Sequence, residues 1–478
     1  MTGPFAGLVT GNVLVAGAGV TGRSVAAALV EMGAEVTVTD GNAERLAELA
    51  DTGATLVPGL TEPPAGTSLV VTSPGWRPSS PLLASAVAAG IDVIGEVELA
   101  WLMSQRLPQP PTWLVVTGTN GKTTTVGMLA EILRADGRNA IACGNVGLTV
   151  IDAIRAGHDV LAVELSSFQL HWQRSLRAHA AVVLNLAEDH LDWHGSMEEY
   201  AKAKGRAYTG AGVVIRNVAD EWSGRLAAEH DGVQVGFGLG VPRPGEVGLV
   251  EDLLVDRAFV DDPSEQAEEL AELADLTALG SHNVANALAA AALARSFGVS
   301  PEAVRAGLRA FRPGAHRAVP LGEVNGVSYV NDSKATNPHA AAGSLLSFES
   351  VVWIAGGLLK GAAVDPLVEA VAGRLRGVVL IGADAEVFAA SLARHAPDVP
   401  VRRLTPGDHE PMIAAVSAAG AMARPGDVVL LAPAAASMDM FRDYAHRGDA
   451  FAGAVAQARD GVTPEGSAAG SDGATGGR

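Results

Sequence analysis

Short apolar runs alternate with longer amphipathic stretches in the first hundred residues. Runs at 13–16, 36–39 and 69–72 each precede a stretch with helical periodicity. Strands followed by helices in this rhythm are typical of an open parallel sheet. We therefore expect an α/β fold that begins with a Rossmann-like domain over residues 1–107.

A proline-rich segment at 106–111 interrupts both periodicities and predicts a stiff linker. The pattern resumes at Trp113, which predicts a central α/β domain over residues 112–312. It should end in two helices, one after Ser281 and one from Pro301. Residues 242–275 are rich in Pro, Asp and Glu, and we expect an excursion that contains a helix and lies outside the core.

The sequence Arg-Pro-Gly at 312–314 marks the next boundary. Apolar runs at 327–330, 351–355, 378–381 and 428–432 repeat the strand-helix rhythm and predict a Rossmann-like C-terminal domain over 313–460. Residues 461–478 are mostly Gly, Ser, Ala and Asp without apolar periodicity, so we expect a disordered tail.

Composition limits the possible partners and compartments. The net charge of −19 argues against nucleic acid or an anionic membrane. The chain has no apolar run of membrane-spanning length and no charged N-terminal leader, so we expect a cytoplasmic protein. Its single cysteine, Cys143, cannot form an internal disulfide, and we interpret it as a small buried hydrophobe.

Lysine is rare in this chain. Only five of the 34 basic residues are lysines, and arginine supplies the rest. A lysine that persists on this background is expected where arginine cannot substitute, as a compact charge on a phosphate or as a reactive amine. The five are Lys122, Lys202, Lys204, Lys334 and Lys360.

The segment around Lys122 has the pattern of a phosphate-binding loop. An apolar strand is followed by GTNGKTTT at 118–125 and by a helical stretch. Glycines let backbone N–H groups converge on phosphates, Lys122 can reach the terminal phosphates, and the Thr123 hydroxyl can hold Mg²⁺. Val116 occupies the first glycine position of the strict P-loop pattern, and a plain glycine turn with a surface lysine is the alternative. ATP is the expected ligand.

A second glycine motif lies in the first domain. GAGVTG at 17–22 follows a strand, and Asp40 closes the next strand, as in dinucleotide-binding proteins. The motif fits an NAD(P)-dependent dehydrogenase, but its backbone N–H groups would hold the pyrophosphate of UDP equally well. A tight turn without a ligand is a third interpretation.

Polar residues follow two strands of the central domain. Glu164 ends the run at 161–164, and His190 follows the run at 182–185. Residues at the carboxyl ends of parallel strands face the ligand crevice, so both side chains could ligate a metal ion. Mg²⁺ prefers oxygen ligands, which leaves a structural loop histidine as an equal alternative for His190.

Taken in order, these motifs resemble the Mur ligases of peptidoglycan synthesis over roughly residues 12–455. The resemblance rests on GTNGKTTT at 118–125, GNVG at 144–147, ELSS at 164–167, the run from Asn185 to His190, HNVAN at 282–286, His316-Arg317, DSKATNP at 332–338 and Ser437-Met438-Asp439. Three motifs are most similar to the branch of the family that adds D-glutamate to UDP-N-acetylmuramoyl-L-alanine. They are GAGVTG at 17–22, DSKATNP at 332–338 and Ser437-Met438-Asp439.

The resemblance implies an ATP-dependent acid–D-amino-acid ligase that works through an acyl phosphate. Its partners would be UDP-N-acetylmuramoyl-L-alanine, D-glutamate and ATP, with Mg²⁺ at two sites, and we expect a monomer. Two alternatives stay open. One is another Mur-type or folylpolyglutamate-like amide ligase, and the other is an NAD(P)-dependent dehydrogenase built on GAGVTG.

The resemblance also assigns roles to individual residues. Catalysis would use Lys122, Glu164, His190 and Lys204. ATP would be bound by Gly118, Thr119, Asn120, Gly121, Lys122, Thr123, Thr124, Asn286, Arg317 and Asp332. The metal ions would be held by Thr123, Glu164, His190 and Lys204, the last as a carbamate that follows Tyr200 by four residues. The two other substrates would contact Val20, Thr21, Asn145, Ser166, Lys334, Thr336, Lys360, Ser437, Met438 and Tyr444.

Overall fold

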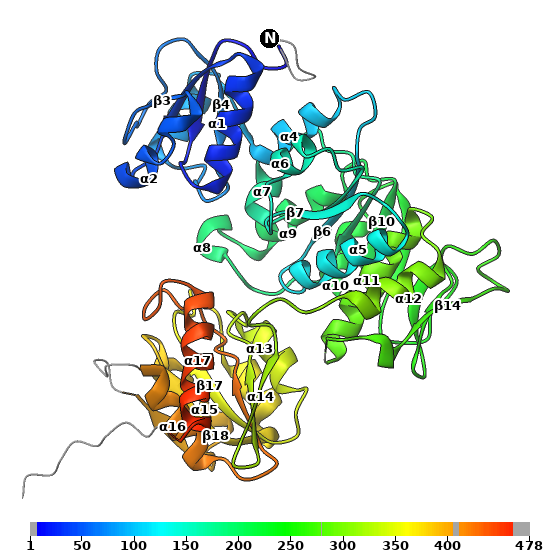
Figure 1. Cartoon of the computed structure of the whole chain (residues 1–478), viewed down its shortest axis with the longest axis vertical. Coiled ribbons are helices and arrows are strands. Elements are labelled where there is room, and N and C mark those ends of the chain that lie inside the picture. The colour runs from blue at the N-terminus through cyan, green and yellow to red at the C-terminus, as the bar shows by residue number, and fades with distance from the viewer. Residues whose placement is uncertain (1–6, 279, 405–410, 462–478) are drawn as a thin grey trace, which may run out of the picture. The chain divides into compact units, whose positions relative to one another are not determined.

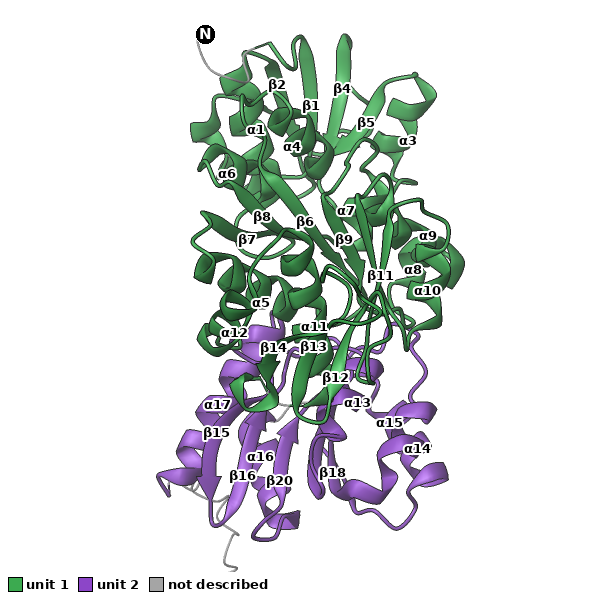
Figure 2. Cartoon of the chain, turned by 90° about the vertical axis from the view of Figure 1, so that its right-hand side faces the viewer, with its two compact units in different colours: residues 1–313 green, residues 314–478 purple. Residues whose placement is uncertain are grey.

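The computed structural model describes residues 7–278, 280–404 and 411–461 (Figure 1). The chain divides into two compact units, residues 1–313 and 314–478 (Figure 2). The expected tail lies outside the described residues from position 462 onward. No helix in the described ranges is long and apolar enough to span a membrane.

Unit 1 begins with a parallel sheet of Rossmann type. Its described strands follow the order β3-β2-β1-β4-β5, which matches five of the six strands of the Rossmann order 3-2-1-4-5-6. The strands expected at 13–16, 36–39 and 69–72 are confirmed as β1, β2 and β4. The elements are β1 (Asn12–Ala16), α1 (Val20–Met32), β2 (Glu35–Thr39), α2 (Ala43–Ala47), β3 (Thr55–Leu56), β4 (Thr67–Thr72), α3 (Pro81–Ala88) and β5 (Asp92–Gly95).

A second sheet follows in the same unit. Its described strands follow the order β14-β13-β12-β11-β10-β9-β6-β8-β7, parallel from β12 to β7. The strands are β6 (Thr112–Thr117), β7 (Ala140–Gly144), β8 (Val160–Glu164), β9 (Ala180–Val183), β10 (Val213–Asn217), β11 (Val233–Phe237), β12 (Glu246–Val250), β13 (Leu253–Asp256) and β14 (Glu268–Glu272). The helices are α4 (Glu96–Ser104), α5 (Lys122–Ala135), α6 (Val150–Arg155), α7 (Ser167–His171), α8 (Leu191–His194), α9 (Met197–Gly205), α10 (Glu221–Ala227), α11 (Ser281–Ser296) and α12 (Pro301–Ala310).

The prediction that residues 242–275 form an excursion with a helix outside the core is wrong. This stretch forms the antiparallel strands β12, β13 and β14, and its helical content is one short 3₁₀ turn. Val247, Leu254 and Leu270 are buried in the core that contains α11 and α12. Alternating apolar residues suit a strand once a sheet edge is available, and Glu251 and Asp252 lie exposed in the turn between β12 and β13. Asp256 of β13 is instead fully buried and pairs with Arg295 at 2.8 Å.

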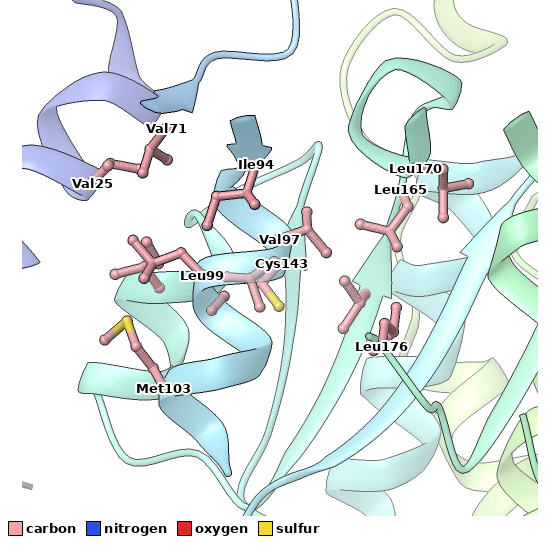
Figure 3. Close-up of a cluster of buried hydrophobic side chains, with 14 of the residues drawn as sticks. Val25, Val71, Ile94, Val97, Leu99, Met103, Cys143, Leu165, Leu170 and Leu176 are labelled. Atoms are coloured by element: carbon pink, nitrogen blue, oxygen red, sulfur yellow. The ribbon is translucent and has the colours of Figure 1, made fainter. Parts of the chain in front are cut away.

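The two sheets of unit 1 share one continuous core. Val25 and Val71 of the first sheet region belong to the same buried cluster as Cys143 and Leu170 of the second, as Figure 3 shows. Helix α4 lies in this cluster and links β5 to the second sheet, with Leu99 and Met103 buried. Cys143 is buried as expected, and burial raises the pKa of its thiol.

Unit 2 has its own sheet and its own core. Its described strands follow the order β15-β16-β20-β17-β18-β19, with β15 antiparallel and the others parallel. The elements are β15 (Val319–Val324), β16 (Val327–Asn331), α13 (Pro338–Leu345), β17 (Val351–Gly356), α14 (Asp365–Val371), β18 (Leu375–Ile381), α15 (Ala385–His395), β19 (Val401–Arg403), α16 (Pro411–Met422), β20 (Val428–Leu431) and α17 (Tyr444–Arg459).

Candidate active site

The loop between β6 and α5 has the geometry of a phosphate cradle. Gly121 caps α5 with φ 86°, so the backbone enters the helix in a left-handed conformation that favours glycine. A Cβ on Gly121 would lie 2.3 Å from Oδ1 of Asn286, which places α11 directly against the loop. The structure thus brings the predicted nucleotide ligand Asn286 to the predicted phosphate loop.

Lys122 and Thr123 occupy the first turn of α5. The Lys122 ammonium donates to the carbonyl oxygens of Gly118 and Thr119, both at 2.9 Å. The Thr123 hydroxyl donates to Oε2 of Glu164 at 2.7 Å. The positive charge therefore lies over the loop, and a hydroxyl and a carboxylate meet beside it.

Glu164, at the end of β8, connects two other predicted site residues, Asn145 and Thr123. Its Oε1 accepts a hydrogen bond of 2.8 Å from Nδ2 of Asn145, while Oε2 accepts from Thr123. Glu164 is 2% exposed, whereas Asn145 lies on the surface. Ser166, two residues further on, caps α7 by accepting from the Gln169 N–H at 3.2 Å.

Lys204 lies beneath the same loop. Its side chain is buried, and its Nζ donates to the Gly118 carbonyl at 2.8 Å. The ammonium also lies 4.8 Å from the Tyr200 ring centroid. Burial, reinforced by the nearby Lys122 charge, lowers the pKa of Lys204 well below its usual value, against the opposing effect of Asp189 and Glu164. The neutral form of the Lys204 amine is therefore more accessible than that of an exposed lysine.

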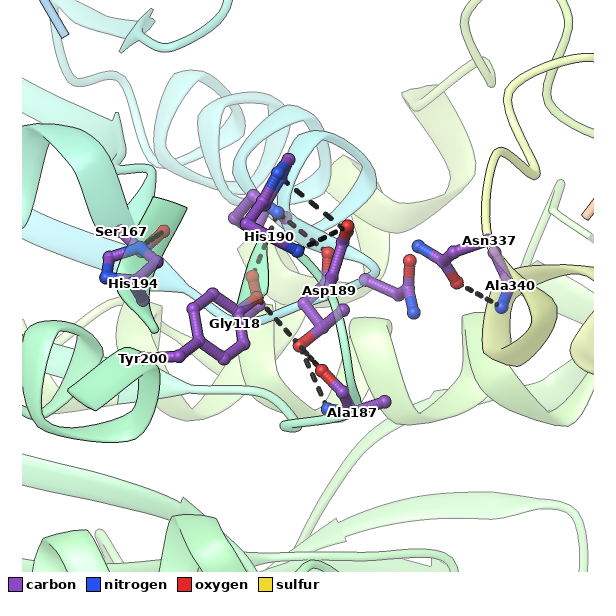
Figure 4. Close-up of polar contacts among 12 residues, drawn as sticks. Gly118, Ser167, Ala187, Asp189, His190, His194, Tyr200, Asn337 and Ala340 are labelled. Atoms are coloured by element: carbon purple, nitrogen blue, oxygen red, sulfur yellow. Dashed lines mark hydrogen bonds and ion pairs between the residues drawn. The ribbon is translucent and has the colours of Figure 1, made fainter. Parts of the chain in front are cut away.

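His190 lies in an aromatic cluster at the start of α8 (Figure 4). Its Nε2 is 3.6 Å from Oδ2 of Asp189, and its ring centroid is 4.8 Å from that of Phe168. His194 donates to or accepts from the Ser167 hydroxyl at 2.9 Å. Burial, with the neighbouring His171 and His190, lowers the pKa of His194 to about 4.

The donor set fits Mg²⁺ at one position beside the loop. Thr123 and Glu164 supply the hydroxyl and carboxylate oxygens that Mg²⁺ prefers, next to a cradle for phosphates. Within the described residues, no three His, Cys, Asp or Glu side chains are grouped to hold a metal ion. A second ion would therefore need an oxygen ligand from another source, and a carbamate on Lys204 would supply one.

The glycine turn of the first sheet is held by Asp40. Its two carboxylate oxygens accept from the Ala18 N–H at 2.8 Å and the Asn42 N–H at 2.9 Å. A dehydrogenase would use this acid for the ribose of its cofactor. Val20, at the first position of α1, is 76% exposed, and Thr21 beside it is half-buried. An exposed apolar side chain at this position offers a contact surface for a planar base.

In unit 2, several predicted residues follow the carboxyl ends of three adjacent parallel strands. Asp332 and Lys334 follow β16, Ser437 follows β20, and Lys360 follows β17. Such ends lie at one edge of the sheet, where ligands bind in α/β folds. Paired backbone hydrogen bonds of 2.8 and 2.9 Å between Leu358 and Ala436 join the last two segments.

The individual environments in unit 2 differ. The Lys334 ammonium lies 3.9 Å from the Tyr444 ring centroid, so the structure brings these two predicted residues together. Asp332 is buried and accepts from Ser344 and from the Ala318 N–H, and burial raises its pKa. The remaining predicted residues are the half-buried Arg317 and Thr336, the buried Ser437, and the exposed Lys360 and Met438.

Two structurally central residues were not predicted as site residues. Asn185 holds the phosphate loop by accepting from the Asn120 N–H at 2.9 Å and donating to the Asn120 carbonyl at 3.2 Å. Arg447, 1% exposed, donates to Ser333 and to the Ala435 carbonyl, and so joins two of the strand-end segments. The position of Asn185 two residues after β9 was a usable signal, whereas Arg447 lies within α17 and gave none.

Three family models match successive parts of the chain. The model described as the Mur ligase MurD-like N-terminal domain matches residues 11–95. The Mur ligase middle domain matches 116–294, and the Mur ligase glutamate ligase domain matches 316–435.

Curated relatives are similar over almost their full length. A protein of Thermobifida fusca named UDP-N-acetylmuramoylalanine--D-glutamate ligase is 58% identical, with 92% of this chain and 97% of the relative covered. The protein of the same name from Streptomyces coelicolor is 56% identical, with 93% and 97% covered.

Solved structures share the fold at low sequence identity. UDP-N-acetylmuramate-alanine ligase MurC from Thermotoga maritima has a TM-score of 0.58 at 18% identity, covering 94% of this chain and 100% of that one. MurF from Acinetobacter baumannii also has a TM-score of 0.58 at 18% identity, covering 89% and 91%. These likenesses support the three-sheet α/β architecture.

Proposed function

The chain belongs to the Mur ligase family, and on that premise we propose that it joins D-glutamate to UDP-N-acetylmuramoyl-L-alanine with ATP, in peptidoglycan precursor synthesis. The observation that carries this proposal is the 58% identity, over 92% of the chain, to a relative that bears the name of this activity. The phosphate cradle at 118–123 and the engagement of Asp40 with backbone N–H groups favour a ligase over a dehydrogenase.

The reaction needs ATP because a carboxylate is a poor acyl donor. Transfer of the γ-phosphoryl group converts the carboxylate of the L-alanyl residue into an acyl phosphate. The D-glutamate amine then attacks the carbonyl, and phosphate leaves as the amide forms. Phosphoryl transfer depends mainly on positioning and charge neutralisation, which the Lys122 ammonium and the loop N–H groups would supply.

We propose that Mg²⁺ binds beside the loop on Thr123 and Glu164, and that His190 and a carbamate on Lys204 hold a second ion. Bound Mg²⁺ would neutralise phosphate charge. Only a neutral amine adds to CO₂ to form a carbamate, and the burial of Lys204 favours that neutral form. The carbamate would replace a buried amine with an anionic oxygen donor.

The acceptor pocket is proposed at the strand ends of unit 2. Lys334 and Lys360 offer two ammonium groups, and Thr336 and Ser437 offer two hydroxyls, enough to bind both carboxylates of glutamate. An acceptor with one carboxylate would leave an ammonium unpaired, and a second ammonium on the acceptor would be repelled. We further propose that the enzyme acts in the cytoplasm as a monomer.

An acceptor panel tests the proposed function. With UDP-N-acetylmuramoyl-L-alanine, ATP and Mg²⁺, phosphate release should be far faster with D-glutamate than with L-glutamate, L-alanine, L-lysine or meso-diaminopimelate. Release without any acceptor is the background control. If another amino acid matches D-glutamate, the pocket argument is wrong although a ligase remains. NAD(P)H turnover without ATP consumption would overturn the ligase itself.

A further inference from the structure

A short segment of unit 1, residues 144–149, joins β7 to α6 and carries Asn145. Its first half is fixed to the phosphate side of the molecule. The Asn145 N–H donates to the Glu164 carbonyl at 2.9 Å, and the Asn145 side chain donates to the Glu164 carboxylate at 2.8 Å. Gly144 N–H donates to the Leu148 carbonyl at 2.8 Å, which closes the segment on itself.

The other end of the segment is fixed to the first sheet region. The Thr149 hydroxyl lies 2.8 Å from the Ser24 hydroxyl, and both side chains are 5% exposed. Thr149 also donates to Oδ2 of Asp152 at 2.9 Å and accepts from the Asp152 N–H at 3.1 Å. One donated and two accepted hydrogen bonds use the full capacity of a hydroxyl, so Ser24 must be the donor to Thr149.

Ser24 lies on α1, one helical turn beyond Val20 and Thr21. Under the proposed function, Val20 and Thr21 contact the uridine end of the nucleotide substrate, and Asn145 contacts its sugar-peptide end. A single buried hydrogen bond therefore joins the helix that binds one end of the substrate to the segment that binds the other.

Two ion pairs also join the first sheet region to the second, but they are more exposed than the Ser24–Thr149 bond. Arg155 pairs with Glu31 at 2.7 Å and Arg77 pairs with Asp192 at 2.8 Å, but these side chains are 35–59% exposed. Exposed ion pairs contribute little to stability or positioning. The Ile151 N–H of α6 donates to Oε1 of the buried Glu96 at 2.9 Å and supports the Ser24–Thr149 bond from the α4 side.

We propose that Thr149, held by Ser24, is a positioning residue for the ligase reaction, one that sets the place of Asn145 relative to the uridine-binding turn of α1. This inference rests on the proposed function. Thr149 does not touch the reacting atoms. Its hydroxyl would fix the distance between Asn145 and the uridine-binding turn, which hold the two ends of one substrate. Misplacement of a bound substrate by about 1 Å is enough to slow a reaction substantially.

Steady-state kinetics separate positioning from simple stability. Thr149→Val should lower kcat/KM for UDP-N-acetylmuramoyl-L-alanine about tenfold and leave KM for ATP unchanged, because the residues assigned to ATP do not include segment 144–149. Thr149→Ser keeps the hydroxyl and should restore the rate. Ser24→Ala should lower kcat/KM as Thr149→Val does, and the double variant should be no worse than Thr149→Val, because both substitutions remove the Ser24–Thr149 bond. Thr149→Val also removes the two bonds to Asp152, so Ser24→Ala is the variant that isolates the link.

Thr52→Val is the matched control. Thr52 is half-buried, and its hydroxyl donates to the Leu49 carbonyl at 2.7 Å and accepts from the Ala54 N–H at 3.5 Å, both within the first sheet region. The variant therefore loses hydroxyl bonds that have no link to the segment. Thr52→Val should keep wild-type kinetics. If Thr149→Val behaves like Thr52→Val, or if the Ser24 and Thr149 effects add, the proposal is overturned.

Hydrogen exchange of the unliganded protein tests the same bond without the reaction. The amides of Gly144 and Asn145 should exchange faster in Thr149→Val and Ser24→Ala than in wild type or Thr52→Val. Unchanged exchange refutes the positioning role whatever the enzyme's substrate is. Faster exchange in a protein that fails to use D-glutamate would instead refute only the proposed function.

Discussion

Lys202 and Lys204 lie two positions apart on α9 and have opposite environments. The Lys202 side chain is 71% exposed and lies 4.0 Å from Glu199, whereas Lys204 is 2% exposed beneath the phosphate loop. Two steps of an α-helix turn the side chain through about 200°, so neighbours at this spacing face opposite sides. The sequence-based choice of Lys204 as the site lysine therefore agrees with its burial, while its carbamylation stays a prediction.

Replacing Lys204 tests that modification. Lys204→Ala should have almost no turnover, because the anionic ligand is lost from the metal site. Added short-chain carboxylic acids should restore part of the rate by supplying a carboxylate. Lys202→Ala is the control and should retain full activity. A fully active Lys204→Ala would contradict the carbamate, and the absence of rescue would assign the amine itself a different role.

Lys122 carries the second prediction at this scale. Lys122→Ala should lower kcat by about 10²-fold or more, comparable with the loss of one preorganised charge-stabilising donor. The melting temperature should change little, because the Lys122 side chain is half-buried and its ammonium bonds to two carbonyls of a loop. Rates of phosphate release near the wild-type value would rule out the phosphate-loop assignment.

Residue chemistry was predictable from sequence where the contacting groups lie close along the chain. The loop from Gly118 to Thr123 is one turn, so its glycines, lysine and threonine could be recognised together. The contact between Ser24 and Thr149 joins residues 125 positions apart. Neither side chain belongs to a motif, and only the packed fold brings them together.

At the scale of elements, α4 connects the two sheets of unit 1 through two buried carboxylates. Glu96 accepts from the Ile151 N–H at 2.9 Å, and Glu98 accepts from the N–H groups of Arg174 and Ser175 at 2.7 and 2.9 Å. Glu96 lies at the N-terminus of α4 and holds the N-terminus of α6. The sequence of α4 is mostly apolar, and nothing in it indicated that Glu96 and Glu98 would be buried.

Glu96 predicts a pH dependence of stability. Burial raises its pKa from 4.5 to about 7, partly offset by the backbone N–H groups of Ile151 and Val150 and reinforced by Asp152. The stabilisation that comes from this raised pKa is fully present below pH 4.5, where Glu96 is protonated in both the folded and the unfolded protein. It is lost as the pH rises to about 7, because the unfolded state ionises first, and the change is on the order of 3 kcal/mol.

Glu96→Gln should remove this dependence, because the amide oxygen still accepts from Ile151 but does not ionise. Urea unfolding at pH 5 and pH 7.5 measures the effect. The free energy of unfolding should fall less with pH in Glu96→Gln than in wild type, whereas Glu62→Gln, at an exposed position, should follow the wild type. Parallel pH profiles for all three proteins would show that Glu96 does not titrate as described.

The prediction of secondary structure succeeded in long segments with a clear hydrophobic period and failed in segments of a few residues. The helices after Ser281 and from Pro301 were expected and are observed as α11 and α12. The strands β12 to β14 were missed because each has only four or five residues, with acidic neighbours. Their burial depends on a sheet edge formed by β11, far more than on their own composition.

At the scale of the whole molecule, each compact unit has its own core. Val71 of β4 is fully buried in the cluster that spans both sheets of unit 1, and Val379 of β18 is fully buried in a cluster of unit 2. The sequence predicted three α/β segments but could not tell which apolar faces meet. A hydrophobic pattern shows that a face is buried, and the partner of that face follows only from the folded chain.

Two valine substitutions test this division by calorimetry. Val71→Ala should lower the melting temperature of the transition that belongs to unit 1 by a few degrees and leave the unit 2 transition unchanged. Val379→Ala should do the reverse. If Val71→Ala instead separates a third transition for the first hundred residues, the shared core of unit 1 does not unfold cooperatively.

The shared core of unit 1 has a consequence for recombination among related ligases. Exchange of the first sheet alone would place Val25 and Val71 of one parent against Cys143 and Leu170 of another, and each would have to fit a surface that evolved separately. A crossover between residues 313 and 314 leaves both cores intact. Functional chimeras should therefore be recovered mainly from exchanges at that position, and the first sheet and the phosphate loop should be inherited together.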